Sequence, residues 1–292
     1  MGAIILARSN SRIIGVIIFQ EPRRDETVLE DPFSSTILGA LEHEIRQSGY
    51  FMMLHTTSDE NDVLRLAKTW KLDGLIILWV PGEICRIIEQ SVETPVVFVD
   101  CYFDDDGQTY HNVGLDDKRG GYEMCRYLLS KGHRKILFLA NDKGFPGGDQ
   151  ARFEGCQEAY KELNLNFEDE CFIPLSKDHH TRESLYRELC ARPLPYTALF
   201  FSADYYAAEA VSFFQEQGID IPRELSVVGF DDNIFSRLIR PHLTTVHQDV
   251  YQKGQSTVAM LMQLIRGETI EMTNIQLPVR LELRQSVQKL IL

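Results

Sequence analysis

The sequence lacks the motifs that mark the commonest nucleotide-binding and hydrolytic enzymes. It contains no G-x-G-x-x-G, no G-x-x-x-x-G-K-[ST] and no G-x-S-x-G, so the dinucleotide-binding, P-loop and α/β-hydrolase classes have no signature here. No apolar run approaches the ~18 residues of a membrane span, and the run at 3–7 is too short for a secretory signal. We therefore expect a cytoplasmic protein that is not an enzyme, uses no cofactor and has no membrane partner.

Basic residues are scarce as well. The 292 residues carry 30 lysines and arginines against 43 aspartates and glutamates, a formal charge of −13. Proteins bind nucleic acid mainly through cations that displace counterions from the phosphates, so we do not expect these residues to form a DNA-binding surface. The length fits one large domain or two lobes of about 150 residues each.

Cysteine pairs with the spacing of metal ligands or redox centres are absent too. The six cysteines form no C-x-x-C motif, and four of them (Cys85, Cys101, Cys125 and Cys156) lie in apolar or helical runs. This pattern predicts buried free thiols in a reducing compartment rather than disulfides or zinc ligands. The other two cysteines are Cys171 and Cys190.

What the sequence does contain is an alternation of short apolar runs with segments of helical periodicity, such as Ile37, Leu41 and Ile45. Most apolar runs are continuous, as in strands buried on both faces of a parallel sheet. The alternation predicts a doubly wound α/β architecture. About six strands precede a turn-rich joint at 141–148, which favours two sheets over one very wide sheet. The predicted strands are Ile13–Phe19, Tyr50–Leu54, Gly74–Trp79, Pro95–Asp100, His111–Leu115, Lys135–Ala140, Thr197–Phe201, Leu225–Phe230 and Thr244–Gln248.

Several predicted strands end in a carboxylate or an amide. Ligands of open α/β sheets bind outside the carboxyl ends of the strands, and such side chains suit a ligand rich in hydroxyl groups, a sugar or a nucleoside. The alternative is that these residues cap the helices that follow, which explains Asp116 and Asp204 equally well. The residues are Asp100, Asp116, Asn141, Asp204, Asp231 and Asp232.

Arg152 is the cation that stands out. It lies in the first turn of a predicted helix, where a positive charge opposes the helix dipole. A guanidinium at this position is able to hold a polar ligand through two hydrogen bonds. The alternative is a salt bridge to Asp149 or Glu154.

Three weaker patterns have simpler interpretations. The glycines at 144, 147 and 148 fit a hinge between lobes better than an anion site. His179 and His180 are expected to lie in a polar loop and lack the spacing of metal ligands. The three aspartates at 104–106 lack the loop length and the terminal glutamate of a calcium site, which favours a solvated loop.

Many of these residues fall in motifs that resemble the LacI/GalR family of bacterial transcriptional regulators. The stretch I-P-R-E-L-S-V-V-G-F-D-D at 221–232 is similar to the most specific signature of the family, and R-F-E-G-C at 152–156 to its R-x-x-G-aromatic motif. The resemblance runs in order from about residue 11 to about residue 285. It implies a periplasmic-binding-protein-like type I fold, with two Rossmann-like lobes, three crossovers and an effector in the cleft. Further matches are S-R-I-I-G-V-I at 11–17, D-P-F at 31–33, D-G-L-I at 73–76, G-H-R-K-I at 132–136 and P-H-L-T-T-V at 241–246.

The resemblance also implies an organisation of the chain. Residues 12–141 and 245–270 would form the N-terminal lobe, residues 142–244 and 271–290 the C-terminal lobe, and residues 1–11 the remnant of a hinge or linker. Members of the family carry an N-terminal helix-turn-helix and bind operator DNA as dimers. We expect this chain to be the effector-binding core without that head, a homodimer that reaches operator DNA only through it.

The resemblance places the effector site residue by residue. Arg152 and Asp231 match the arginine and the aspartate that usually hydrogen-bond the effector, while Phe33 and Gln248 match an aromatic and a polar cleft position. Two positions depart from the family: Ser34 replaces a second aromatic residue, and Ala203 replaces an asparagine. Phe200, Phe201, Tyr205 and Tyr206 lie near the second departure and either face a sugar ring or belong to the core. The predicted effector-binding residues are Phe33, Ser34, Trp79, Arg152, Asp204, Asp231 and Gln248.

These expectations combine into one function. The chain would sense a sugar or a nucleoside-like metabolite in the interlobe cleft and couple closure of the cleft to operator binding. The alternative is a solute-binding protein for sugar uptake, which shares the fold but would need a secretory signal and would more often avoid free cysteines. An enzyme on the same scaffold is a third option, although no pairing of a nucleophile with a base is visible by motif.

Overall fold

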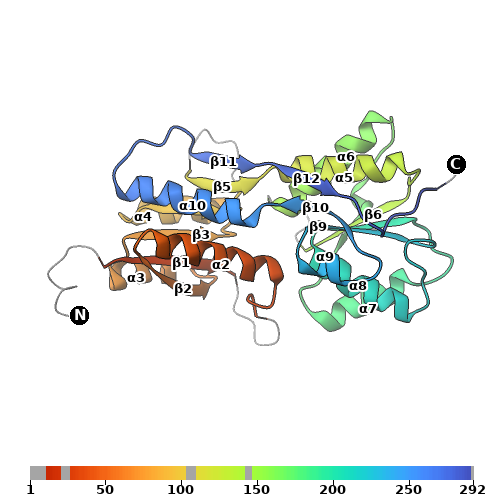
Figure 1. Ribbon diagram of the computed structural model, residues 1–292, viewed down its shortest axis with the longest axis horizontal. Coiled ribbons are helices and arrows are strands. Elements are labelled where there is room, and N and C mark those ends of the chain that lie inside the picture. The colour runs from red at the N-terminus through yellow and green to blue at the C-terminus, as the bar shows by residue number, and fades with distance from the viewer. Residues whose placement is uncertain (1–10, 21–26, 103–109, 142–146, 291–292) are drawn as a thin grey trace. The chain divides into compact units, whose positions relative to one another are not determined.

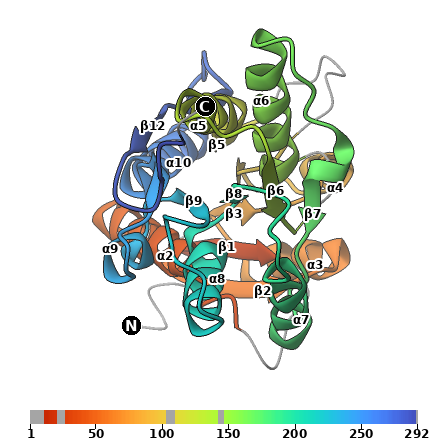
Figure 2. The same cartoon turned by 90° about the vertical axis from the view of Figure 1, so that its right-hand side faces the viewer.

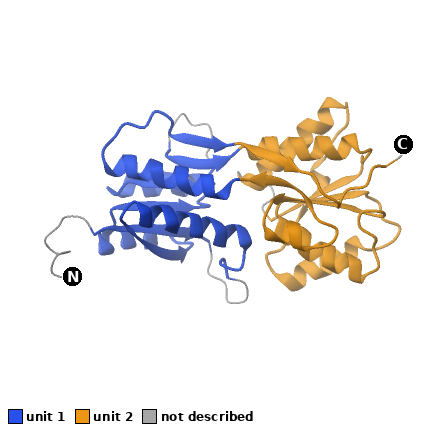
Figure 3. Ribbon diagram, in the orientation of Figure 1, with its two compact units in different colours: residues 1–115, 249–277 blue, residues 116–248, 278–292 orange. Residues whose placement is uncertain are grey.

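The computed structural model describes residues 11–20, 27–102, 110–141 and 147–290. The chain divides into two compact units (Figure 3): unit 1 comprises 1–115 and 249–277, and unit 2 comprises 116–248 and 278–292. The backbone therefore passes from one unit to the other three times, after Leu115, after Gln248 and after Leu277. Each unit is built around its own sheet with helices between the strands (Figure 1).

The described part of unit 1 contains a six-stranded sheet in the order β11-β5-β4-β3-β1-β2. All neighbouring strands are parallel, so their carboxyl ends meet at one edge. The elements are β1 (Ile13–Phe19), α2 (Pro32–Gln47), β2 (Phe51–Thr57), α3 (Glu60–Trp70), β3 (Gly74–Leu78), α4 (Gly82–Ser91), β4 (Val96–Val99), β5 (Asn112–Leu115), α10 (Val250–Ile265) and β11 (Asn274–Leu277).

The described part of unit 2 contains a second six-stranded sheet, in the order β12-β10-β9-β8-β6-β7. Its strands are parallel except β12, which runs antiparallel to β10. The elements are α5 (Asp117–Ser130), β6 (Ile136–Ala140), α6 (Gly148–Glu162), the 3₁₀ turn Asp169–Cys171, β7 (Phe172–Pro174), α7 (His179–Leu189), β8 (Ala198–Phe201), α8 (Asp204–Glu216), β9 (Ser226–Asp231), α9 (Ile234–Leu238), β10 (Thr244–Gln248) and β12 (Val279–Glu282).

The continuous apolar runs form the buried centres of both sheets, as the sequence predicts. Every residue of β3 and β4 is buried, and so is every residue of β8. The predicted strand boundaries agree with the structure to within a few residues. The strand β7 has only three residues and was not predicted, since so short a run carries no detectable pattern.

The crossovers between the units differ from the predicted lobe boundaries at 141, 244 and 270. The first lies after Leu115, because α5 packs on α6, and β6 pairs with β7 and β8. The second lies after Gln248, because β10 pairs with β9 along its length. The third lies after Leu277, because β11 pairs with β5, and Pro278 separates it from β12, which pairs with β10.

The helices α5 and α6 of unit 2 lie side by side (Figure 2) and approach each other through two glycines. A Cβ atom on Gly121 would lie 1.9 Å from the carbonyl oxygen of Arg152, and one on Gly155 would lie 2.0 Å from the carbonyl oxygen of Lys118. Neither position tolerates a side chain unless the helices separate, because both of these neighbours are backbone atoms. The backbone at Arg152 is thus fixed by direct contact with α5.

Gly121→Ala is expected to lower the free energy of unfolding by about 1–3 kcal/mol, the usual cost of overpacking. Urea unfolding followed by circular dichroism measures it. Gly39→Ala is the matched control, because Gly39 is also helical but a Cβ atom added to it would meet no atom within 4 Å. The control should gain about 0.5–1 kcal/mol. A Gly121→Ala protein as stable as the control would contradict the close packing of α5 and α6.

The structure can also be compared with the predictions made for the cysteines and for membrane spans. Cys85, Cys101, Cys125 and Cys156 are buried as predicted, whereas Cys171 and Cys190 are only half-buried. Among the described helices, none has both the length and the apolar character needed to span a bilayer. The predicted hinge glycine at 144, the aspartates at 104–106 and the predicted linker up to residue 10 lie outside the described residues.

Candidate functional site

Besides Asp204, which opens α8 just after β8, three of the predicted effector-binding residues lie at or near the carboxyl edge of the unit 2 sheet. Asp231 is the last residue of β9, Gln248 is the last residue of β10, and Arg152 lies near the start of α6. Because β8, β9 and β10 are parallel, their carboxyl ends open at the same edge. The fold therefore brings together residues that are up to about a hundred positions apart in the sequence.

The guanidinium of Arg152 is held from three sides within unit 2. Its Nε donates to Oδ1 of Asp117 at 2.7 Å, and its Nη1 donates to the carbonyl oxygen of Ser202 at 2.6 Å. The Arg152 Cζ lies 3.6 Å from the centre of the Phe230 ring, which is close enough for a cation–π contact. The main salt-bridge partner is thus Asp117 rather than either of the two carboxylates expected from the sequence. Asp149 is 3.9 Å away, and Glu154 accepts from Gln150 instead.

The side chains of Asp231 and Gln248 are hydrogen-bonded to each other. Asp231 directly follows Phe230, whose ring contacts Arg152. The Nε2 of Gln248 donates to Oδ1 of Asp231 at 2.6 Å, and both side chains are largely buried. Asp231 has a φ of 108° and Asp232 a φ of 57°, conformations that non-glycine residues adopt only at a cost. Such strain is concentrated at functional sites, and here it turns the end of β9 away from a regular strand.

Asp204 has a different environment from its predicted neighbours. It is completely buried, accepts from Thr245 Oγ1 at 2.6 Å and accepts from the Asn233 amide at 3.0 Å. Burial and the nearby charge of Asp231 raise its pKa well above the ordinary value. These contacts favour a role in joining the start of α8 to β10 and to the turn before α9. By contrast, Asp116 caps α5, accepting from the Arg119 amide.

In unit 1 the carboxyl edge of the sheet carries aromatic and charged side chains. The rings of Phe33, at the start of α2, and Trp79, directly after β3, have centroids 6.2 Å apart. Asp100, directly after β4, accepts from the Nζ of Lys253 with both carboxylate oxygens, each at 2.7 Å. That ammonium also lies 5.0 Å from the centre of the Phe33 ring. Trp79 and Asp100 both have positive φ values, 62° and 51°, a further sign of a constrained site.

Ser34 belongs to the capping structure of α2. Its amide and its hydroxyl both donate to Oδ2 of Asp31, at 2.8 and 2.6 Å, and the side chain is buried. The Ser34 hydroxyl therefore adds a hydrogen bond to the N-terminal cap of α2. These contacts favour a structural role for Ser34, while Phe33 next to it keeps its ring against Trp79.

Two residues at these edges could not be assigned from the sequence. Asp117 directly follows Asp116, and nothing in the pattern shows which of the two turns toward Arg152. Lys253 lies within the amphipathic helix at 250–265 and is fully buried. A lysine among the apolar positions of such a helix was the available signal, because lysine is almost never fully buried without a partner.

Other predicted features have structural roles. Phe200 and Phe201 are buried in the core, whereas Tyr205 and Tyr206 are half-buried on α8. His179 and His180 open α7 rather than lying in a loop, and His179 contacts Glu209 through Nδ1 at 2.7 Å. Asn141 donates through its side chain to the carbonyl oxygen of Leu175 and ties the end of β6 to the chain after β7.

Comparison with known proteins identifies the kind of chain that carries these residues. Residues 125–287 match the family model described as a periplasmic binding protein-like domain. The chain belongs to this family. It is 28% identical to the HTH-type transcriptional regulator MalR of Clostridium butyricum over 275 residues, which is 90% of this chain and 78% of the relative. It is 27% identical to the HTH-type transcriptional repressor PurR of Pectobacterium atrosepticum, over 89% of this chain and 78% of that protein.

Solved structures of periplasmic binding protein-like chains show the same fold. The transcriptional regulator CelR in complex with cellobiose matches with a TM-score of 0.83 at 20% identity, over 95% of this chain and 85% of that chain. A LacI family transcriptional regulator from Enterococcus faecium with bound ribose matches with a TM-score of 0.79 at 25% identity, over 96% and 100%. The lac repressor dimer bound to operator matches with a TM-score of 0.80 at 22% identity, over 98% of each chain.

Two predictions are thereby confirmed. The fold is the periplasmic-binding-protein-like type I α/β fold, with two sheets of mostly parallel strands. The resemblance to LacI/GalR-type regulators is confirmed as well, and the chain corresponds to the effector-binding core of that family. The assignment of individual effector-binding residues stays a prediction.

Proposed function

We propose that this chain is the sensor core of a DNA-binding transcriptional regulator and that a small polar metabolite, a sugar or a nucleoside, is its effector. The observation that carries the proposal is the gathering of Arg152, Asp231 and Gln248 at the carboxyl edge of the unit 2 sheet. The names of the relatives support it: MalR and PurR are HTH-type regulators, and two structural neighbours contain cellobiose or ribose.

The chemistry of these residues fits a ligand with hydroxyl groups. A carboxylate accepts two hydrogen bonds from adjacent hydroxyls, an amide donates and accepts, and a guanidinium donates in a fixed plane. The ring pair of Phe33 and Trp79 in unit 1 offers an apolar face of the kind on which a sugar or a base packs. In the proposal, ligand held by both sets of residues favours one arrangement of the units over another.

Such a preference is what regulation requires. A ligand shifts a conformational equilibrium only by its difference in affinity for the two states, and useful coupling is about 1–3 kcal/mol. We further propose that the chain acts as a homodimer and that operator DNA is bound by an N-terminal helix-turn-helix domain of the full regulator. The formal charge of −13 fits a sensor that leaves DNA contact to another domain.

Calorimetry with D-ribose, cellobiose, adenosine and guanosine tests the effector site. Arg152→Ala and Asp231→Asn are each expected to weaken the best ligand at least tenfold, because each removes a charge-assisted hydrogen bond of about 1.5–3 kcal/mol. Arg119→Ala, which removes an exposed arginine of α5 in the same unit, is the control and should bind as the wild type does. Unchanged affinity in both site variants would show that the ligand binds elsewhere.

A further inference from the structure

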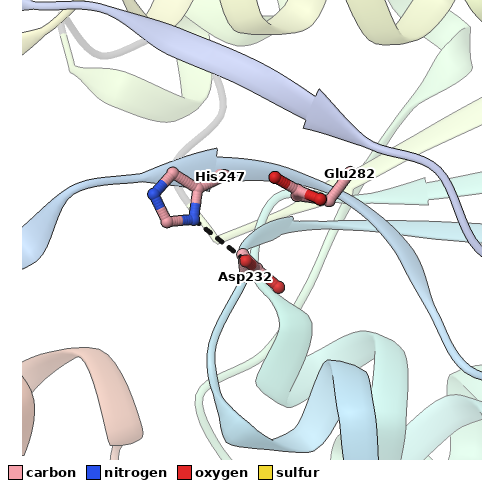
Figure 4. A group of neighbouring side chains, drawn as sticks. All are labelled: Asp232, His247 and Glu282. Atoms are coloured by element: carbon pink, nitrogen blue, oxygen red, sulfur yellow. Dashed lines mark hydrogen bonds and ion pairs between the residues drawn. The ribbon is translucent and has the colours of Figure 1, made fainter.

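A second group of polar side chains lies in unit 2, and two of its three members are sequence neighbours of the candidate effector residues Asp231 and Gln248. Asp232, directly after β9, His247 of β10 and Glu282 of β12 each offer one donor atom, and these atoms all lie within 4.8 Å of one another. Figure 4 shows the three side chains near one another on three neighbouring segments, with the imidazole in contact with Asp232. The three side chains are half-buried, so an ion from solvent is able to reach them.

Each carboxylate of the group is held in place by an arginine. Arg284 pairs with Oδ1 of Asp232, and Arg280 donates through Nε to Oε1 of Glu282 at 2.9 Å. The remaining Asp232 oxygen, Oδ2, lies 2.9 Å from Nδ1 of His247. Outer partners of this kind orient the ligands of metal sites and leave the second oxygen of each carboxylate for the metal. The positive charges of the two guanidiniums also offset the negative charges of the two carboxylates, which reduces the repulsion between the carboxylates.

The donor set selects the kind of cation. One imidazole nitrogen and two carboxylate oxygens suit Zn²⁺ and the neighbouring first-row divalent ions. Mg²⁺ and Ca²⁺ instead favour six or more oxygen ligands. We propose that Asp232, His247 and Glu282 form a binding site for a divalent transition-metal ion of the Zn²⁺ type, with water completing the coordination. On binding, the metal takes the position between His247 Nδ1 and Asp232 Oδ2; a neutral imidazole then carries its one proton on Nε2, and an imidazolium releases its second proton to solvent.

The position of the group gives such an ion a structural consequence. The chain passes from unit 2 to unit 1 after Gln248, the residue that follows His247. It returns to unit 2 after Leu277, and Glu282 lies in β12, the strand that begins two residues later. The strands β10 and β12 are already paired, with Thr245 opposite Glu282 and His247 opposite Arg280. A cation bound to both strands and to the end of β9 therefore reinforces the unit 2 ends of two of the three interunit connections. It should stabilise unit 2, since a ligand that binds only the folded state raises its stability.

Zinc titration of the full chain, freed of metal with a chelator, tests the site. Calorimetry is expected to show one Zn²⁺ per chain, and Co²⁺ in its place should give the visible absorption of a site with nitrogen and oxygen ligands. His247→Gln keeps a donor to Asp232, while Glu282→Gln preserves shape and removes the charge. Each is expected to weaken Zn²⁺ binding at least tenfold and to abolish the zinc-dependent rise in Tm, with circular dichroism confirming the fold of both variants.

A matched control is available in unit 1. The Nε2 of His55 lies 2.7 Å from Oδ2 of Asp62, and Arg65 also pairs with that aspartate. In the part of the chain that the structure describes, no third donor atom completes this pair, so His55→Gln should leave zinc binding unchanged. Absence of zinc binding in the wild type, or equal binding in the wild type and both site variants, would overturn the proposal. The proposal would also be overturned if the site bound Mg²⁺ as tightly as it binds Zn²⁺.

Discussion

Glu209→Leu is expected to lower the free energy of unfolding by about 3–5 kcal/mol, because it leaves a buried guanidinium without its carboxylate. Arg182 of α7 is fully buried, and it meets Glu209 of α8 through two hydrogen bonds, Nε to Oε2 at 2.8 Å and Nη2 to Oε1 at 2.9 Å. Tyr186 donates its hydroxyl to the same carboxylate at 2.8 Å. The substitution removes an acceptor for all of these donors at once.

Urea unfolding gives the loss, and hydrogen exchange should place it in α7 and α8. Glu42→Gln is the control, because Glu42 and Arg46 form an exposed i,i+4 pair whose removal costs about 0.3–0.5 kcal/mol. The double variant Arg182→Met with Glu209→Leu should recover part of the loss, since an apolar pair avoids burying an unpaired charge. Equal losses in Glu209→Leu and Glu42→Gln would show that the buried pair contributes no more than a surface pair.

The same contact predicts a dependence on pH. Burial opposes ionisation of Glu209, but hydrogen bonds from Arg182, His179 and Tyr186 outweigh it and hold its pKa below the ordinary value. A lowered folded-state pKa adds stability above the unfolded pKa of about 4.3, and this stability is lost as the pH falls through the folded pKa. The difference in stability between the wild type and Glu209→Leu should therefore narrow below about pH 4. A constant difference down to about pH 3 would contradict this.

The sequence predicted the strands of both sheets well because burial on both faces demands continuous apolar runs. The run at 13–19 and the run at 244–248 match β1 and β10 residue for residue. The crossovers were harder, since pairing between distant strands leaves no local trace. Only the sheet shows that β11 pairs with β5, whereas β12, one residue later, pairs with β10.

The same contrast between local patterns and long-range contacts applies to the candidate site. The strand-end position of Asp231 and the family resemblance at Gln248 pointed to the same sheet edge, and the structure joins the two side chains by a hydrogen bond of 2.6 Å. Partners were not predictable where two residues compete for one role. The sequence offers Asp149 and Glu154 beside Arg152, one turn or less away, but the carboxylate that holds the guanidinium is Asp117, 35 positions earlier. Long-range pairing of charges follows from packing, in this instance from the contact of α5 with α6.

Asp100→Asn is expected to lower the stability of unit 1 by about 3 kcal/mol, the lower end of the cost of breaking a buried ion pair. Lys253 is fully buried, and its Nζ lies 2.7 Å from both oxygens of Asp100. Asparagine tolerates the left-handed conformation that Asp100 adopts, with a φ of 51°, so the change removes charge and leaves the backbone in place. The amide oxygen still accepts one hydrogen bond, which keeps the loss at the lower end.

Hydrogen exchange should place this loss in β4 and α10, the two elements that the pair joins, while α7 and α8 of unit 2 keep their protection. Asp59→Asn is the matched control in unit 1, because Asp59 caps α3 through a hydrogen bond from Asn61 and asparagine caps a helix about as well. The double variant Asp100→Asn with Lys253→Met removes the buried ammonium and should recover much of the loss. If Asp100→Asn matches the Asp59→Asn control in both stability and exchange, Lys253 does not depend on Asp100 for its burial, and the pair is not what fixes α10 against β4.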